Sequence, residues 1–161
     1  MPVHGMEASH EPDGYHCPLC ALLVGVENEW NRASDLVAVE PLAFARISPK
    51  AWVDQPGNAL VCTTDHVENL YGLSVAQNAA LFGLVQRVAV AMHSSYGCDG
   101  ISIRQHNEPA GDQDLWHVHV HVFPRYAGDE LYRRHDDTAW IDAAVRAGWA
   151  ERLRAGLTPP S

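Results

Sequence analysis

Basic residues are scarce in this chain. Lysine and arginine together number 11 against 20 aspartates and glutamates, which gives a formal net charge of −9 at pH 7. A protein that follows a nucleic-acid backbone needs clustered positive charge to neutralise phosphates. The composition therefore argues against a nucleic acid polymer as partner, whereas a small anionic ligand needs only a few local donors.

Long apolar runs and cysteines are scarce as well. The apolar stretch from Ala21 to Val26 is far too short to span a bilayer, and residues 1–14 carry neither the basic start nor the apolar core of a signal peptide. We therefore expect a cytoplasmic protein without a membrane partner. Cys17 and Cys20 form a pair, and in a cytosolic chain such a pair indicates a metal or redox site before a structural disulfide.

Hydrophobic periodicity and turn residues predict one α+β domain built on an antiparallel sheet. The clearest helix starts at Ser74, where Gln77 completes a capping box, and it ends at Gly97. Residues between Ser48 and Asn58 are typical of turns. The other expected elements are a short helix from about Cys17, a last helix from Thr138 to Leu153, and strands at Leu36–Glu40, Leu42–Ile47, Leu60–Thr63 and Ile101–Gln105.

Histidines alternate with valines in the run His117-Val118-His119-Val120-His121-Val122-Phe123-Pro124-Arg125, which we call the histidine run. Successive side chains of a strand point to opposite faces, so His117, His119 and His121 are expected to share one face. Imidazole serves as nucleophile, proton shuttle or metal ligand near neutral pH. A solvated histidine-rich face and a histidine metal site are the alternatives. The strand is expected to stop at Pro124.

The histidine run resembles the signature of the histidine triad (HIT) family, in which three histidines alternate with apolar residues. The resemblance extends from Cys17 to Tyr126, and it implies a HIT-like fold: an antiparallel five-stranded sheet, one long helix and a short N-terminal helix. Residues 1–14 are rich in glycine, proline and charge and are expected to form a flexible leader. The resemblance implies a HIT domain over residues 15–127, and we expect residues 128–161 to form a helical extension that packs on the domain or on a dimer partner. Similar segments are Leu42-Ala43-Phe44, Ile47-Ser48-Pro49, Pro56-Gly57, Leu60-Val61, Asp65–Leu70, Asn107-Glu108 and Gly111-Asp112-Gln113.

The resemblance implies a nucleotide hydrolase or transferase that cleaves a nucleoside 5′-phosphoryl compound, either a phosphoramidate or a dinucleoside polyphosphate. His119 is then the nucleophile that becomes a nucleotidyl-histidine, because a neutral imidazole attacks without prior deprotonation. His121 contacts the phosphoryl oxygens and helps to protonate the leaving group. A homodimer and no organic cofactor are also implied. The alternatives are a non-catalytic, zinc-stabilised nucleotide-binding module and a metallohydrolase with three histidines on one metal.

Cys17 and Cys20 have the spacing of a zinc knuckle, but a complete site needs two more ligands. The resemblance to bacterial family members implies that His66 and His117 supply them and that the Zn²⁺ is structural. A redox pair and two buried cysteines stay open as alternatives, and His16 is a competing ligand.

The expected substrate contacts are Asn107, Gln113, Phe44 and Arg46. Arg46 stands where many family members have an aspartate that binds the ribose hydroxyls. An arginine cannot accept from hydroxyls, so we expect Arg46 to face solvent or to bind an extra phosphate. Asp114 stands where relatives often have serine, and its carboxylate repels a phosphate unless it is turned away or screened. The histidines taken as ordinary surface residues are His4, His10, His93, His106 and His135.

Overall fold

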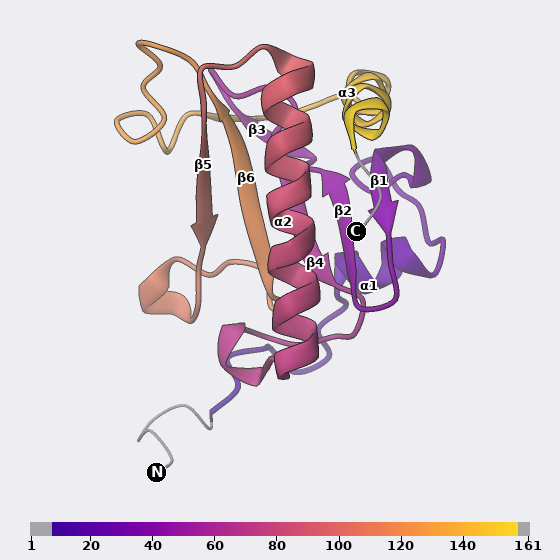
Figure 1. The fold of residues 1–161 in the computed structure, drawn as a ribbon. Coiled ribbons are helices and arrows are strands. Elements are labelled where there is room, and N and C mark those ends of the chain that lie inside the picture. Colours follow the sequence, from indigo (N-terminus) through magenta and orange to yellow (C-terminus); the bar gives the residue numbers. More distant parts are fainter. Residues whose placement is uncertain (1–7, 158–161) are drawn as a thin grey trace.

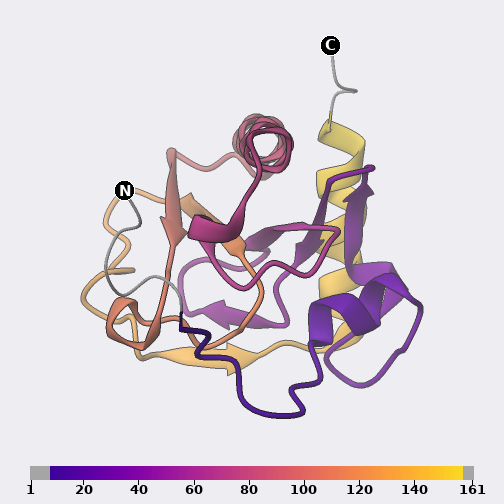
Figure 2. The ribbon, with the colours of Figure 1, turned by 90° about the horizontal axis from the view of Figure 1, so that it is seen from below.

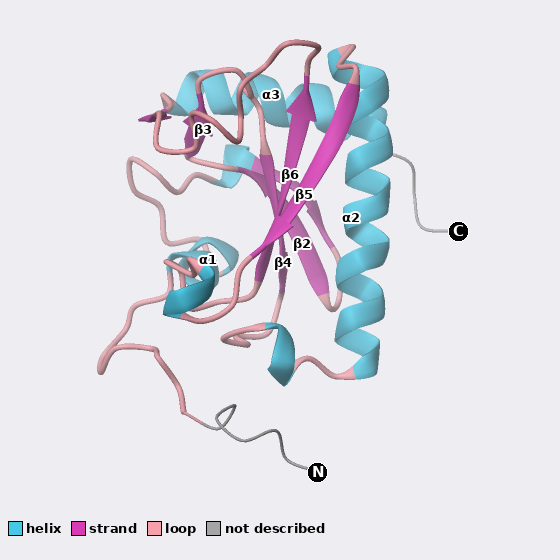
Figure 3. Cartoon of the chain, turned by 90° about the vertical axis from the view of Figure 1, so that its left-hand side faces the viewer, coloured by secondary structure: helices cyan, strands magenta, loops and turns pink. Residues whose placement is uncertain are grey.

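A computed structural model of the chain describes residues 8–157. Its centre is an antiparallel sheet of five strands in the order β1-β2-β4-β6-β5, and the long helix α2 lies along one face (Figure 1, Figure 3). The predicted α+β class, five-stranded sheet and long helix are therefore confirmed. The strands are β1 (Leu36–Val39), β2 (Ala43–Ile47), β4 (Ala59–Thr63), β5 (Gly100–Gln105) and β6 (His119–Arg125).

Helix α2 (Val75–Tyr96) begins and ends as its sequence predicts. The Ser74 hydroxyl accepts from the Gln77 N–H, the Gln77 side chain accepts from the Ser74 N–H, and Gly97 ends the helix with φ 66°. By length and composition alone α2 is long and apolar enough to cross a membrane, a test that the core helix of a soluble protein also passes. Its buried side chains form the core with the sheet, namely Leu81, Leu84, Val88 and Met92 against Val61, Val118, Val120 and Val122.

Helix α1 (Pro18–Leu23) confirms the short N-terminal helix. It lies on the other side of the sheet from α2, as Figure 2 shows in a view along the α2 axis. Leu19 and Leu22 of α1 pack on Phe44, Leu60 and Cys62, which point away from α2. The sheet is thus covered on both faces near β2 and β4.

A small ribbon of two strands was not predicted. The expected turn between Ser48 and Asn58 contains β3 (Lys50–Trp52), which pairs antiparallel with β7 (Thr138–Trp140). The last helix therefore begins at Ala143 instead of Thr138, and α3 covers Ala143–Gly156. Strands this short give no periodic signal in the sequence, and each forms only by pairing with a partner that lies far away in the chain.

The end of β6 was also predicted wrongly, because Pro124 lies inside the strand. It pairs with Ile101 of β5, whereas the pairing of β6 with β4 ends at Val122. The carbonyl of Arg125 accepts from Asp99 on the β5 side, so the preceding Pro124 nitrogen points to the other side, beyond the end of β4. A proline costs no ladder hydrogen bond in that position.

The described part of the C-terminal extension packs on the domain of its own chain. Trp149 of α3 lies against Tyr96 of α2, with ring centres 4.7 Å apart. It also covers Gly57, where a Cβ atom would come within 2.7 Å of the indole and where φ is +78°. Residues 1–7 of the expected leader and residues 158–161 of the extension lie outside the described residues.

Candidate active site

The histidine run divides between two places. His119 and His121 of β6 point away from α2 into one cleft, and their ring centres are 5.1 Å apart. His117 precedes the strand, and its ring lies 5.2 Å from that of His66. The predicted line of three imidazoles on one face is therefore two imidazoles in the cleft and one beside the cysteine pair.

The hydrogen bond of His119 determines which of its nitrogens is free. Its Nδ1 lies 2.8 Å from the carbonyl oxygen of His117. A carbonyl only accepts, so Nδ1 carries the proton and Nε2 keeps its lone pair. Burial lowers the pKa of His119, which favours the neutral imidazole. The residue is thereby prepared to act as a nucleophile through Nε2.

Aromatic rings hold His121 in place. Its ring stacks on Phe123 at 5.4 Å and meets the edge of Trp52 at 5.8 Å. Its Nδ1 is buried and has no hydrogen-bond partner within the described chain. Burial first, and then the charges on His119 and Arg104, lower the pKa of His121 well below its ordinary value. A hydrogen-bonding ligand in the cleft would satisfy this nitrogen.

The cleft has a volume of about 550 Å³ and receives side chains from the sheet, from the β3–β7 ribbon and from three connecting segments. Trp52 of β3 donates through Nε1 to the carbonyl of His135, which ties the ribbon to the loop before β7. We expected His106 and His135 to be ordinary surface residues, but both line the cleft, although the His135 side chain is 62% exposed. The lining residues that carry charge or aromatic rings are Lys50, Trp52, Arg104, His106, Asp112, Asp114, His119, His121, His135, Asp136 and Trp140.

Sequence reasoning missed several of these lining residues. Arg104 lies within a predicted strand, but only the pairing register of β5 with β6 places it opposite His121. Lys50 and Trp52 belong to β3, which had been expected as a turn. Trp140 belongs to β7, which had been expected as helix. The signal that sequence alone offered for Arg104 was a charged residue inside the predicted strand Ile101–Gln105.

The four predicted metal ligands come together as a Cys/His cluster of Cys17, Cys20, His66 and His117, whose ligand atoms lie within 4.8 Å of one another. Sγ of Cys17 is 3.3 Å from Nδ1 of His117, and Sγ of Cys20 is 3.4 Å from Nδ1 of His66. Tetrahedral Zn²⁺ places its sulfur and nitrogen ligands roughly 3.3–3.8 Å apart. The cluster therefore fits one tetrahedral metal ion.

Neighbouring groups orient both histidines of the Cys/His cluster. Nε2 of His117 donates to the carbonyl of Thr63 at 2.8 Å, which leaves Nδ1 to bind the metal. Burial lowers the pKa of His117 to about 4. Nε2 of His66 lies 2.6 Å from the carboxylate of Glu11, which belongs to the expected leader. Glu68 holds this segment through the Ser9 hydroxyl and the His10 N–H.

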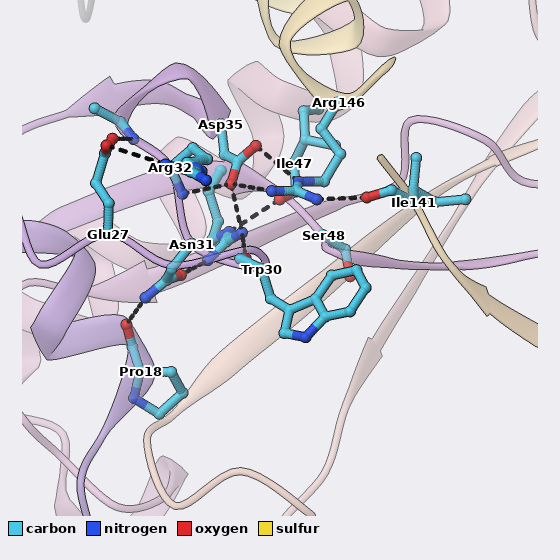
Figure 4. A network of polar contacts seen from close by, with 12 residues as sticks. Pro18, Glu27, Trp30, Asn31, Arg32, Asp35, Ile47, Ser48, Ile141 and Arg146 are labelled. Atoms are coloured by element: carbon cyan, nitrogen blue, oxygen red, sulfur yellow. Dashed lines mark hydrogen bonds and ion pairs between the residues drawn. The ribbon is translucent and has the colours of Figure 1, made fainter. Parts of the chain in front are cut away.

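Arg46 neither faces solvent nor reaches the cleft, so both expectations for it were wrong. It is buried, and its Nη2 lies 2.9 Å from the carboxylate of Asp35. Arg146 of α3 binds the same carboxylate at 2.8 Å (Figure 4). We call Asp35, Arg46 and Arg146 the charge cluster. A buried guanidinium needs a counter-charge, and Asp35 supplies it from the protein itself.

The other expected substrate contacts are not among the residues that line the cleft. Phe44 is buried beneath α1. The Asn107 side chain accepts from the Leu70 N–H at 2.8 Å. The Gln113 side chain accepts from the Glu108 N–H at 2.8 Å and donates to the Glu68 carbonyl at 2.6 Å. Asn107 and Gln113 thus brace the loop before the histidine run, in which Asp112 has φ 66°.

The sequence profile of the HIT domain matches residues 34–128, which is more than half of the chain. The chain belongs to the HIT domain family. Among curated HIT relatives, the Protein hit of Bacillus subtilis is 29% identical over 100 residues, which cover 60% of this chain and 66% of that protein. The bis(5′-adenosyl)-triphosphatase of Dictyostelium discoideum is 28% identical over 94 residues, which cover 58% of this chain and 62% of that protein.

Solved structures support the HIT fold. A Zn-bound histidine triad family protein from Mycobacterium smegmatis superimposes with a TM-score of 0.71 at 23% identity, covering 87% of this chain and 91% of that one. The matches span less than two thirds of the length of the curated relatives named above.

Proposed function

We propose that this HIT protein transfers a nucleoside 5′-monophosphoryl group from a phosphoramidate or a dinucleoside polyphosphate to His119, and from there to water. The observation that carries the proposal is the 2.8 Å contact of Nδ1 of His119 with the carbonyl of His117. It supports a neutral imidazole whose Nε2 lone pair points into a cleft of about 550 Å³.

The first step forms the bond from His119 Nε2 to the α-phosphorus and breaks the bond from that phosphorus to the leaving group. The electron pair of the broken bond goes to the leaving atom, which takes up a proton through His121, the residue beside it. In the second step, water attacks the phosphorus and gives up a proton, the P–N bond breaks, and the nitrogen lone pair returns to His119. The proton released by the water replaces the one taken up by the leaving atom. Splitting the displacement in two lowers each barrier.

We also propose that the Cys/His cluster holds a structural Zn²⁺. All four coordination positions are taken by side chains, so the metal supplies stability and orders the N-terminal segment on the sheet. His117 links the two sites, because its side chain belongs to the cluster while its carbonyl binds His119. The homodimer and the cytoplasmic location stay predictions.

The test is turnover of adenosine phosphoramidate and diadenosine polyphosphates, followed by chromatography of the released AMP. We expect the wild type to release AMP and His119→Ala to release none. His93→Ala is the matched control, because His93 is exposed on α2, on the opposite side of the sheet, and it should retain full activity. A folded wild type that binds AMP without turning over any of these compounds would refute the enzymatic proposal and favour a nucleotide-binding module.

A further inference from the structure

Arg104 places a guanidinium at the His121 end of the cleft. It lies on β5 directly opposite His121 of β6, and residues paired in this way share one face of the sheet. Its guanidinium carbon lies 5.2 Å from the ring centre of Trp52 and 4.8 Å from that of Phe123. The two rings therefore hold both the arginine and the histidine in the cleft.

Two polar atoms at this end of the cleft lack partners. Nε of Arg104 and Nδ1 of His121 are both buried, and neither has a hydrogen-bond partner within the described chain. A buried donor without a partner costs free energy, which a bound anion recovers. Nε of Arg104 only donates, and Nδ1 of His121 donates when it carries the ring proton, so two such atoms on adjacent, paired residues indicate a ligand with acceptor oxygens.

The other charges of the cleft leave Arg104 available. The carboxylates of Asp112, Asp114 and Asp136 line the same cleft, but none forms an ion pair with Arg104 among residues 8–157, and Asp112 acts on Arg104 only as a nearby charge. Contact with aromatic rings engages the flat face of a guanidinium and leaves its N–H edge for hydrogen bonds in the plane. That edge matches the oxygens of a phosphate, which a guanidinium binds through two parallel hydrogen bonds.

We infer that Arg104 binds a phosphate of the leaving group, so that the site prefers substrates whose leaving group is itself a phosphate over those that release ammonia or an amine. The inference rests on the proposed function, because the attack of His119 defines which group leaves. His121 is the residue beside the leaving atom in that mechanism, and Arg104 is its neighbour across the β5–β6 pairing. Arg104 is thereby a specificity-determining residue.

The test compares two substrates that share the AMP group. Diadenosine triphosphate releases ADP, and adenosine phosphoramidate releases ammonia. We expect Arg104→Met to lower kcat/KM for the triphosphate by about 10- to 100-fold, as for a lost charge-assisted hydrogen bond, and for the phosphoramidate by less than about threefold. Arg104→Lys should lie between, and Arg133→Met should match the wild type, because the Arg133 side chain is 85% exposed.

Equal losses on both substrates, or no loss on either, would overturn the inference. Thermal unfolding checks that Arg104→Met is folded, and Arg104→Lys takes its place in the comparison if it is not. If the wild type turns over neither substrate, the proposed function fails separately, and calorimetric binding of ADP and AMP decides the role of Arg104. A preference for ADP that is lost in the variant supports the phosphate site, whereas an unchanged ratio overturns it.

Discussion

Replacing Asp35 by Ala should destabilise this protein severely. The carboxylate has no solvent exposure and binds Arg46 at 2.9 Å and Arg146 at 2.8 Å. It also accepts from the Arg32 N–H at 3.0 Å. Its removal leaves two buried guanidinium groups without a counter-charge, and loss of one partner of a buried ion pair costs about 3–5 kcal/mol. Because two buried cations lose their counter-charge, we expect the loss of unfolding free energy to lie at the upper end of this range. That is a large share of the roughly 5–15 kcal/mol that stabilises a domain.

Urea unfolding followed by circular dichroism measures this loss as the change in unfolding free energy. Glu130→Gln is the control, since it breaks an exposed ion pair with Arg133 and should cost less than about 1 kcal/mol. A triple variant with Asp35→Leu, Arg46→Met and Arg146→Met removes all buried charge and should recover most of the stability. A cost below about 1 kcal/mol for Asp35→Ala would refute the reasoning, because it would mean that the guanidinium groups do not depend on this carboxylate.

Three further predictions concern other parts of the molecule. Removal of the metal by a chelator should lower the melting temperature in a calorimetric scan, and turnover should decline only as the fold loosens, whereas an immediate loss at full helicity would indicate a catalytic metal. Trp52→Ala should lower kcat in a turnover assay even under conditions where the variant is fully folded, because the Trp52 ring orients His121. Activity equal to the wild type would contradict that role. The guanidinium of Arg125 holds the pKa of the Asp129 carboxyl well below its usual range. The stability that this pair contributes is therefore present above the ordinary carboxyl pKa of about 4 and is lost as the pH falls further. Urea titrations from pH 6 to pH 3 should show a steeper decline for the wild type than for Asp129→Asn, and parallel curves would count against the pair.

Features that depend on local chemistry could be predicted from the sequence. The capping box of Ser74 and Gln77 satisfies backbone groups within one turn, so its partners are neighbours in the chain. The alternation of histidine and valine in β6 follows from the period of a strand. The Cys/His cluster was predicted because the resemblance named all four ligands, although three separate segments supply them.

Features that depend on pairing between distant segments could not be predicted. Arg46 was predicted to contact substrate, but its guanidinium pairs with Asp35, which also binds Arg146. These residues come from three different elements, so no local sequence pattern indicates their contact. In the same way, Arg104 gains its place in the cleft from the register of β5 against β6. The ribbon of β3 and β7 has too few residues in each strand for a periodic signal.

The ribbon has a consequence for how this protein can diversify. The HIT domain profile ends at residue 128, yet His135, Asp136 and Trp140 from beyond that point line the cleft. His119 and His121 on one side, and one wall of their cleft on the other, are thus encoded in separate stretches of the chain. Substitutions or loop exchanges between Gly128 and Trp140 could reshape what the cleft accepts while the strand that carries His119 stays as it is, which makes this stretch the natural target for redesigning selectivity.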